Sequence, residues 1–219
     1  MNEKYVTGVN AEGYYDIELD LEDILTSNGA IDELFYLKDL QQRKIFLTTT
    51  ITQSTVDDVV HSILQFNRED ADIPVETRKP ILLYLTSLGG EVDAGFEMID
   101  VIRMSKTPIH VINLGYCYSM GFLIFIAGHQ RFASENAKFL MHDGSSFVYN
   151  STTKAKDQML FNDKVDERLK RYVLSHTKIT EAEYDERQRQ EWYMFADEAQ
   201  EKGIVDKIIG VDCDIMTIV

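Results

Sequence analysis

The sequence predicts an α/β fold whose core is a parallel sheet, and three observations lead to this prediction. The 219 residues are 44% hydrophobic, which is enough for one domain with a sizeable core. Short apolar runs alternate with amphipathic stretches along most of the chain. One run, ILLYLT at 81–86, is almost continuously apolar, as is typical of a strand covered on both faces. We therefore expect repeated β-α-β units.

Residues 1–42 are more acidic and less periodic than the rest, and we interpret them as an acidic N-terminal arm. The predicted domain spans 43–208, and 209–219 form a C-terminal tail. The first strand of the domain is KIFLTTTIT at 44–52, which is rich in β-branched residues. Ser54 and Asp57 then form a capping-box-like start of an amphipathic helix.

The alternation of strand and helix continues to the end of the domain. Beyond the strand at 81–86 we expect a helix at 91–104, strands at 109–114, 131–134 and 138–142, a long helix at about 152–175, a helix after Thr180 that continues to 192, a short helix at 197–203 and a strand at 204–209. The long helix is highly charged but has an apolar stripe. Either a partner subunit or its own domain could cover that stripe.

The overall charge excludes several classes of partner. Lys and Arg total 22 against 37 Asp and Glu, a net charge of −15, which repels phosphate backbones and anionic lipids. We therefore expect no nucleic-acid partner. The N-terminal segment has no apolar stretch suited to a signal or a membrane span, so we expect a cytoplasmic protein without membrane contact. Neither Cys117 nor Cys213 has disulfide or metal-ligand spacing, and the five histidines are scattered. No metal or cofactor is predicted.

Three short motifs that follow predicted strands carry groups capable of chemistry: TSLGGEVDAG at 86–95, GYCYSMG at 115–121 and FLMHDG at 139–144. Each has an ordinary explanation when taken alone, namely a glycine turn, a helix cap at Ser119 and a surface histidine at His142. Together they supply a hydroxyl nucleophile, a base and backbone donors for an oxyanion. The combination predicts an acyl-transfer enzyme.

The order and spacing of these motifs resemble the proteolytic subunits of Clp proteases, which have a Gly-Gly turn, an A-S-M-G nucleophile helix and an M-I-H-Q-P histidine strand. The resemblance runs from QRKIFLTTTITQSTVDDVVHSILQFN to FADEAQEKGIVDKII, about residues 42–208. It implies a crotonase-like (ClpP-like) α/β head with a projecting handle helix. It also implies a homo-oligomer of stacked rings, in which a serine endopeptidase cleaves unfolded proteins or peptides inside a chamber. An unfoldase ATPase usually feeds that chamber, so ATP would act only through this partner, and Tyr84 lies where the family builds part of its docking cleft.

The resemblance also implies roles for individual residues. Ser119 would attack the scissile carbonyl, and His142 would accept its proton. The backbone N–H groups of Gly90 and Met120 would form the oxyanion hole. An extended substrate would pair as an added strand with the main chain around three residues: Gly89, Glu91 and Val92.

The third member of the triad departs from the family pattern. An ungapped alignment places Arg187 at the position of the family's aspartate, and an arginine cannot orient a neutral imidazole. The carboxylates nearby are Asp185, Glu186 and Glu191, and we take Asp185 as the candidate.

Other functions stay open at this point. A non-catalytic ring subunit would account for Arg187. A crotonase-type acyl-CoA enzyme would use the oxyanion hole on a thioester and needs no Ser–His pair. A Ser–Lys peptidase of the kind that degrades signal peptides is a lesser alternative, because such an enzyme would be associated with a membrane.

Overall fold

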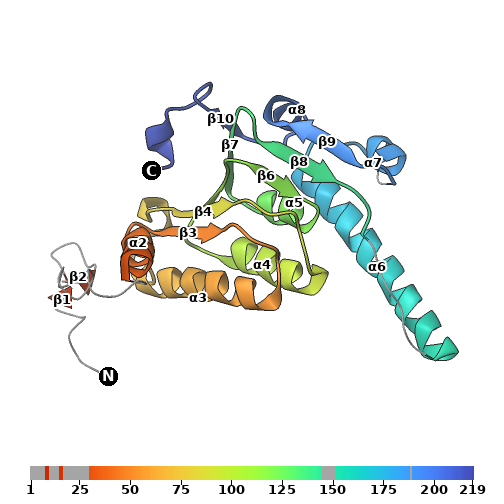
Figure 1. Cartoon of the computed structure of the whole chain (residues 1–219), viewed down its shortest axis with the longest axis horizontal. Coiled ribbons are helices and arrows are strands. Elements are labelled where there is room, and N and C mark those ends of the chain that lie inside the picture. The colour runs from red at the N-terminus through yellow and green to blue at the C-terminus, as the bar shows by residue number, and fades with distance from the viewer. Residues whose placement is uncertain (1–7, 10–14, 17–29, 145–150, 188) are drawn as a thin grey trace. The chain divides into compact units, whose positions relative to one another are not determined.

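The computed structural model describes residues 8–9, 15–16, 30–144, 151–187 and 189–219 (Figure 1). The chain forms two compact units, 1–45 and 46–219. In the first unit, β1 (Gly8–Val9) pairs antiparallel with β2 (Tyr15–Asp16), and α2 (Ala30–Gln41) follows. This helix lies inside the segment interpreted as an arm; the rest of that arm lies largely outside the described residues.

The main sheet has five strands in the order β10 (Lys207–Ile209), β7 (Gln130–Ser134), β5 (Ile109–Asn113), β4 (Ile81–Leu85) and β3 (Lys44–Leu47). The pairs β10–β7, β7–β5 and β5–β4 are all parallel. Each β4 residue is buried, as the apolar run predicted. The predicted α/β class is therefore confirmed. The first strand ends at Leu47, and Ile51 beyond it forms an isolated bridge with Gly90.

Two amphipathic helices, α3 (Gln53–Glu69) and α4 (Val92–Met104), pack side by side against one face of this sheet (Figure 1). The capping box of α3 is formed by Thr52 and Thr55, because the Thr52 amide donates to Thr55 Oγ1 at 3.0 Å and the Thr55 amide donates to Thr52 Oγ1 at 3.4 Å. The predicted cap at Ser54 was therefore wrong by two residues. β-Branched Thr52 stays extended and begins the helix earlier.

A second, three-stranded sheet has the order β6 (Tyr116–Tyr118), β8 (Lys138–Met141) and β9 (Trp192–Phe195). β6 and β8 are parallel, and β9 is antiparallel to β8. The short buried helix α5 (Met120–Phe125) contacts strands of both sheets. β9 lies where the predicted helix ends, since α7 (Glu181–Arg187) stops four residues before Glu191. Pairing with β8 outweighs the helical preference of the charged run.

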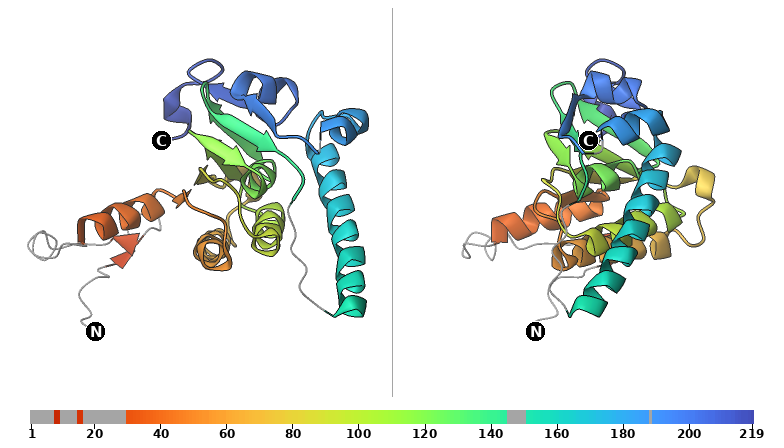
Figure 2. Two further views of the ribbon diagram at one scale, coloured as in Figure 1. Left: turned by 45° about the vertical axis from the view of Figure 1, so that its right-hand side comes forward. Right: turned by 90° about the vertical axis from the view of Figure 1, so that its right-hand side faces the viewer.

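The long helix α6 (Thr152–His176) agrees with the prediction and runs away from both sheets (Figures 1 and 2). Its C-terminal end packs on the domain, where Tyr172 and Val173 are buried and the Tyr172 hydroxyl donates to the Leu123 carbonyl. Nearer its N-terminus the side chains of Met159, Leu160 and Phe161 are each at least 60% exposed. Its own domain thus covers only one end of the apolar stripe.

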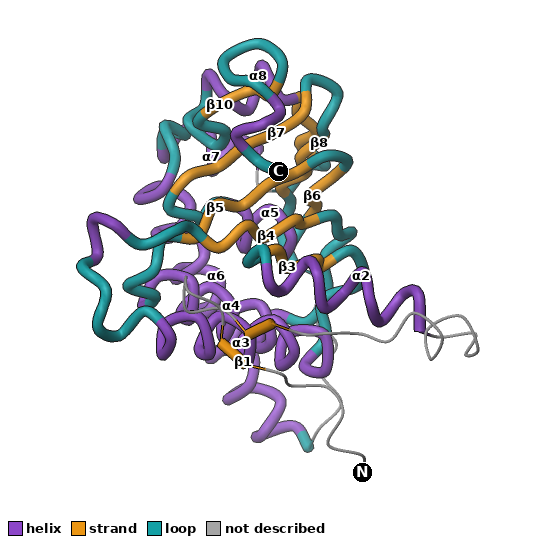
Figure 3. Tube along the Cα trace, turned by 90° about the vertical axis from the view of Figure 1, so that its left-hand side faces the viewer, coloured by secondary structure: helices purple, strands orange, loops and turns teal. Residues whose placement is uncertain are grey.

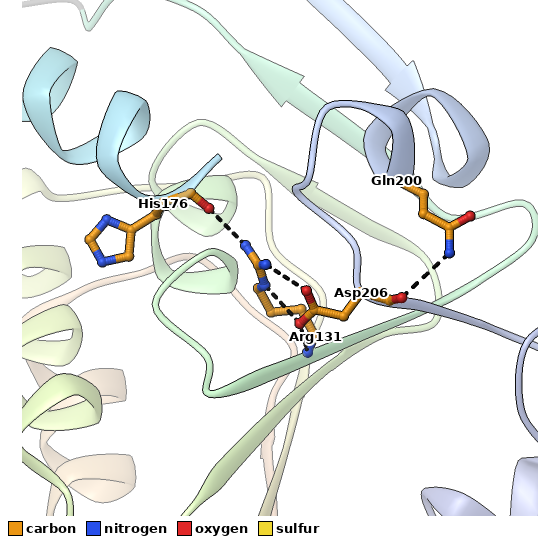
Figure 4. Close-up of polar contacts among 4 residues, drawn as sticks. All are labelled: Arg131, His176, Gln200 and Asp206. Atoms are coloured by element: carbon orange, nitrogen blue, oxygen red, sulfur yellow. Dashed lines mark hydrogen bonds and ion pairs between the residues drawn. The ribbon is translucent and has the colours of Figure 1, made fainter. Parts of the chain in front are cut away.

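A polar cluster fixes the C-terminal end of α6 to the main sheet (Figure 4). The Arg131 guanidinium on β7 donates to the Asp206 carboxylate at 2.6 and 3.0 Å and to the His176 carbonyl at 3.0 Å. Gln200 of α8 (Ala196–Glu201) donates to the Asp206 carbonyl at 3.4 Å. One arginine therefore joins the end of α6 to the start of β10.

Two histidines, His110 in β5 and His129 just before β7, should make stability depend on pH. His129 Nδ1 accepts a hydrogen bond from the Ile109 amide at 3.0 Å, which requires a neutral ring. Burial lowers the pKa of His129, and burial, then the His129 and Lys207 charges, lowers the pKa of His110. Below a pH of about 6.5, the ordinary pKa of a histidine, the unfolded chain therefore binds more protons at these two positions than the folded chain does. The free energy of unfolding should fall as pH drops from 7.5 to 5.5.

This dependence can be measured by urea denaturation across that pH range. We expect the loss to be smaller in His129→Gln, because glutamine keeps an acceptor for the Ile109 amide and does not titrate. His61→Gln, on the exposed surface of α3, should behave like the wild type. An equal loss of stability in all three chains would contradict the role given to His129.

Candidate active site

Ser119 occupies the turn between β6 and α5 in a strained backbone conformation. Its φ is 54° and its ψ is −120°, in a region that non-glycine residues rarely adopt. Its amide donates to the Leu140 carbonyl of β8 at 2.9 Å, which holds this turn against the neighbouring strand. The side chain is half-buried, so the hydroxyl is not enclosed in the core. Strain at one serine that follows a strand and begins a helix is typical of a positioned nucleophile.

The Gly-Gly turn packs directly against this serine. A Cβ at Gly89, whose φ is +103°, would lie 2.8 Å from Ser119 Cβ and 3.1 Å from the Met120 nitrogen. On the other side, the Ile51 amide donates to the Gly89 carbonyl and the Glu91 amide donates to the Ile51 carbonyl, both at 2.9 Å. In this bridge Gly90 is the central residue, so its own N–H points away from Ile51.

Two backbone donors, one in the Gly-Gly turn and one at the start of α5, are available in this region. The Gly90 amide makes no hydrogen bond to any residue that the structure describes. Met120 is the first residue of α5, so its N–H has no partner within that helix. Together they are suited to stabilise an oxyanion at Ser119.

Ser119 and His142 follow the carboxyl ends of two adjacent parallel strands. β6 and β8 pair in the register Tyr118↔Leu140, and the two residues come directly after these strands. Both side chains are half-buried. No hydrogen bond joins the Ser119 hydroxyl to the imidazole within the described ranges, and such bonds often tighten only when a substrate is bound.

The imidazole of His142 is held by a carboxylate. Its Nδ1 lies 3.0 Å from Glu191 Oε1. The antiparallel register of β8 and β9 explains this contact: Met141 pairs with Trp192, so the next pair along the same ladder is His142 and Glu191. Glu191 therefore contacts Nδ1 and leaves Nε2 available, which is the arrangement that a catalytic triad requires.

A model of the Clp protease family matches residues 28–212. The chain belongs to the Clp protease family. A curated relative, "ATP-dependent Clp protease proteolytic subunit 2" of Treponema pallidum (strain Nichols), is 26% identical over 186 residues, which cover 84% of this chain and 90% of that protein. The mixed α/β fold with its mostly parallel main sheet agrees with membership of the Clp protease family.

The structure places the other candidates for the acid of this Clp-family site elsewhere. The Asp185 carboxylate accepts from Lys170 Nζ at 2.7 Å, and Lys170 also pairs with Glu181 at 2.9 Å. The hydrogen bond with Asp185 has the larger effect and that with Glu181 the smaller, and both raise the pKa of Lys170. Arg187 lies with its guanidinium 5.6 Å from the centre of the Trp192 ring. Asp185 is thus paired with Lys170, and Glu191 is the carboxylate that contacts His142.

The structure also limits how a substrate could pair with the Gly-Gly turn of this Clp-family chain. The Gly89 amide donates to Ser87 Oγ at 3.1 Å, and its carbonyl accepts from Ile51. The Glu91 amide is used by Ile51, and its carbonyl accepts from the Gly95 amide at 3.0 Å. Of the positions expected to pair, Gly89 and Glu91 already use their main-chain groups. The remaining donors are Gly90 and Val92, the first residue of α4.

Within the described ranges, no three His, Cys, Asp or Glu side chains form a group that could hold a metal ion. None of the helices in the part of the chain that the structure describes is long and apolar enough to cross a membrane.

Proposed function

We propose that this chain is a serine endopeptidase in which Ser119 is the nucleophile, His142 the general base and Glu191 the acid that orients the base. The observation that supports the proposal is a strained serine directly after β6 together with a histidine directly after the neighbouring strand β8, whose Nδ1 contacts a carboxylate at 3.0 Å. Membership of the Clp protease family supports a peptidase.

The proposed chemistry follows from the roles of these groups. Ser119 Oγ attacks the peptide carbonyl while His142 Nε2 takes its proton, and the oxyanion forms beside the amides of Gly90 and Met120. The imidazolium then gives the proton to the leaving amine, and the bond to nitrogen breaks. Water hydrolyses the acyl-enzyme with His142 again as base. These steps need no metal or cofactor.

We further propose that the peptidase works as a homo-oligomer of stacked rings in the cytoplasm, with unfolded proteins as substrates. The exposed side chains of Met159, Leu160 and Phe161 on α6 support a contact with a second copy. Adjacent apolar side chains exposed to water are typical of surfaces that another protein chain buries. An unfoldase ATPase would deliver substrates; the Treponema pallidum relative is a subunit of an ATP-dependent Clp protease.

Two of the alternative functions lose support from this geometry. A non-catalytic subunit was favoured by Arg187 in place of the acid, but Glu191 occupies the position beside His142. A crotonase-type acyl-CoA enzyme needs neither a strained serine after one strand nor a histidine held by a carboxylate after the neighbouring strand.

A serine-reactive fluorophosphonate provides the direct test. We expect one adduct, on Ser119, when the oligomer is labelled and digested for mass spectrometry, because only an activated hydroxyl reacts quickly. Ser119→Ala should abolish the adduct, while Ser62→Ala, at a half-buried serine of α3, should not. Labelling elsewhere, or none in the assembled oligomer, would exclude the proposed nucleophile.

A further inference from the structure

One face of the three-stranded sheet gathers tyrosine side chains. Side chains point alternately to the two faces of a strand, so the register decides which residues share a face. Phe139 of β8 marks the inner face, because its ring packs against Phe125 of α5 with ring centres 4.8 Å apart. The residues that alternate with Phe139 and with its partners in β6 and β9 form the outer face: Tyr116, Tyr118, Lys138, Leu140, Tyr193 and Phe195. We call this set the tyrosine face; two of its strands, β6 and β8, run side by side in Figure 3.

The tyrosine face continues directly into the candidate active site. His142 and Glu191 stand two positions from Leu140 and Tyr193 in their strands, so they belong to the same face. The 3.0 Å contact between His142 and Glu191 agrees with this placement. Residues two apart in a strand are separated by roughly 7 Å. The tyrosine face therefore starts one residue pair away from the imidazole of His142.

Three tyrosine rings form a layer over the middle of this face. Tyr118, which immediately precedes Ser119, and Tyr193 lie in the strands on either side of Leu140. Their rings meet edge to face with centres 5.7 Å apart, and the Tyr116 ring lies 5.2 Å from that of Tyr118. Leu140 is consequently only 5% exposed although it points outward. The rings thus pack on one another and on Leu140, and this packing defines their orientation.

The layer is still open to a ligand on its outer side. Tyr193 is 56% exposed, Phe195 50% and Tyr116 36%. Exposed aromatic rings that already pack edge to face bind a further ring well, because ring–ring contacts add to the burial of apolar area. Lys138 Nζ lies 6.0 Å from the centre of the Phe195 ring, and its charge opposes a basic side chain at this place. The chemistry of the face thus favours an aromatic substrate side chain.

We propose that the tyrosine face is a substrate subsite that selects an aromatic side chain close to the scissile bond, with Tyr193 as its main specificity residue. The inference rests on the proposed peptidase function, because it names the substrates that the same site prefers. Residues of an extended peptide are spaced by about 3.3–3.6 Å, so a side chain that reaches a surface roughly 7 Å from His142 belongs to a residue about two positions from the cleaved bond. The subsite is therefore separate from the one that receives the residue whose carbonyl Ser119 attacks.

Matched fluorogenic peptides test this selection. Each peptide carries Phe or Ala at one of the three positions on either side of a defined cleaved bond. In the wild-type chain, kcat/KM for Phe should exceed that for Ala by about tenfold or more at one position about two residues from the bond. Tyr193→Leu keeps an apolar cover for Leu140 and should reduce this ratio to about threefold or less, whereas Tyr193→Phe should retain it. Tyr36→Ala, at a tyrosine of α2 that is 54% exposed, should leave the ratio unchanged.

Peptide binding to Ser119→Ala separates this proposal from the proposed function. By fluorescence anisotropy, the labelled Phe peptide should bind this variant about tenfold more tightly than the Ala peptide, and the added change Tyr193→Leu should remove most of that difference. If the wild type hydrolyses no peptide while this selective binding is observed, the peptidase proposal fails and the subsite stands. Equal binding of both peptides, or a difference that persists with Tyr193→Leu, would overturn the subsite. So would a loss of native oligomer mass in Tyr193→Leu with the Phe-to-Ala ratio intact, because it would assign the tyrosine face to a contact between copies.

Discussion

Glu191→Gln should lower the kcat for peptide hydrolysis by about 10⁴-fold with little change in KM, because an amide at His142 Nδ1 no longer selects the reactive tautomer. The carboxylate that contacts Nδ1 at 3.0 Å also stabilises the imidazolium that forms when Ser119 loses its proton. Glutamine has nearly the same shape, so the fold and the Ser119 turn should be retained. Steady-state kinetics with a fluorogenic peptide measures the effect.

Matched variants of nearby residues separate this role from general electrostatics. Asp185→Asn changes the same charge but pairs with Lys170, so its kcat should stay within about twofold of the wild type. Glu191→Asp keeps the charge on a shorter side chain and should recover part of the rate. If Asp185→Asn lost activity and Glu191→Gln did not, the assignment of the acid would be reversed.

Gly90→Ala should abolish measurable peptidase activity and also destabilise the fold. An added Cβ would lie 2.0 Å from the Ile51 carbonyl oxygen and 2.8 Å from its nitrogen, and φ at this position is +155°. Ile51 is fully buried, so its backbone cannot move aside cheaply. The amide of residue 90 would shift, and the loss of one oxyanion donor alone costs about 10²–10³ in kcat.

Both effects can be read in one set of samples, by peptide hydrolysis and by thermal unfolding. We expect a destabilisation of about 2 kcal/mol or more from strain and steric clash. Gly144→Ala is the matched control, because a Cβ there would meet nothing within 4 Å. Wild-type kcat in Gly90→Ala would show that this amide does not serve the oxyanion.

Local patterns were enough to predict most of the fold and to single out two residues of the candidate site. The buried run at 81–85 and the long helix α6 are visible in the sequence because burial and helical periodicity leave direct signatures. Ser119 and His142 could be found in the same way, since each follows a strand within a motif of recognisable chemistry. The ends of parallel strands then place them at one edge of a sheet.

The acid could not be found from local patterns. Glu191 meets His142 only because β9 pairs with β8 in one register across 49 positions of sequence. The residues from Glu181 onward favour a helix, and the sequence therefore predicts one that continues to 192. In the structure the helix α7 ends at Arg187, and Glu191 lies beyond it. Register between distant strands is decided by packing, and a single sequence does not display it. If β9 and its pairing of Met141 with Trp192 were known, the next pair along the ladder would identify Glu191 as the residue opposite His142.

The hydrogen bond from Arg131 to the His176 carbonyl fixes one end of α6, and the rest of the helix extends from that fixed end. The helix has 25 residues and is therefore roughly 37 Å long. The carbonyl of its last residue, His176, accepts a hydrogen bond from Arg131 of the main sheet. The exposed side chains of Met159, Leu160 and Phe161 lie near the other end of the helix. A small rotation of the helix about its fixed end at His176 would therefore displace its N-terminal end by a much larger distance. The chain continues from His176 through α7 to Glu191, so the segment between them is fixed at one end by Arg131 and at the other by the contact with His142.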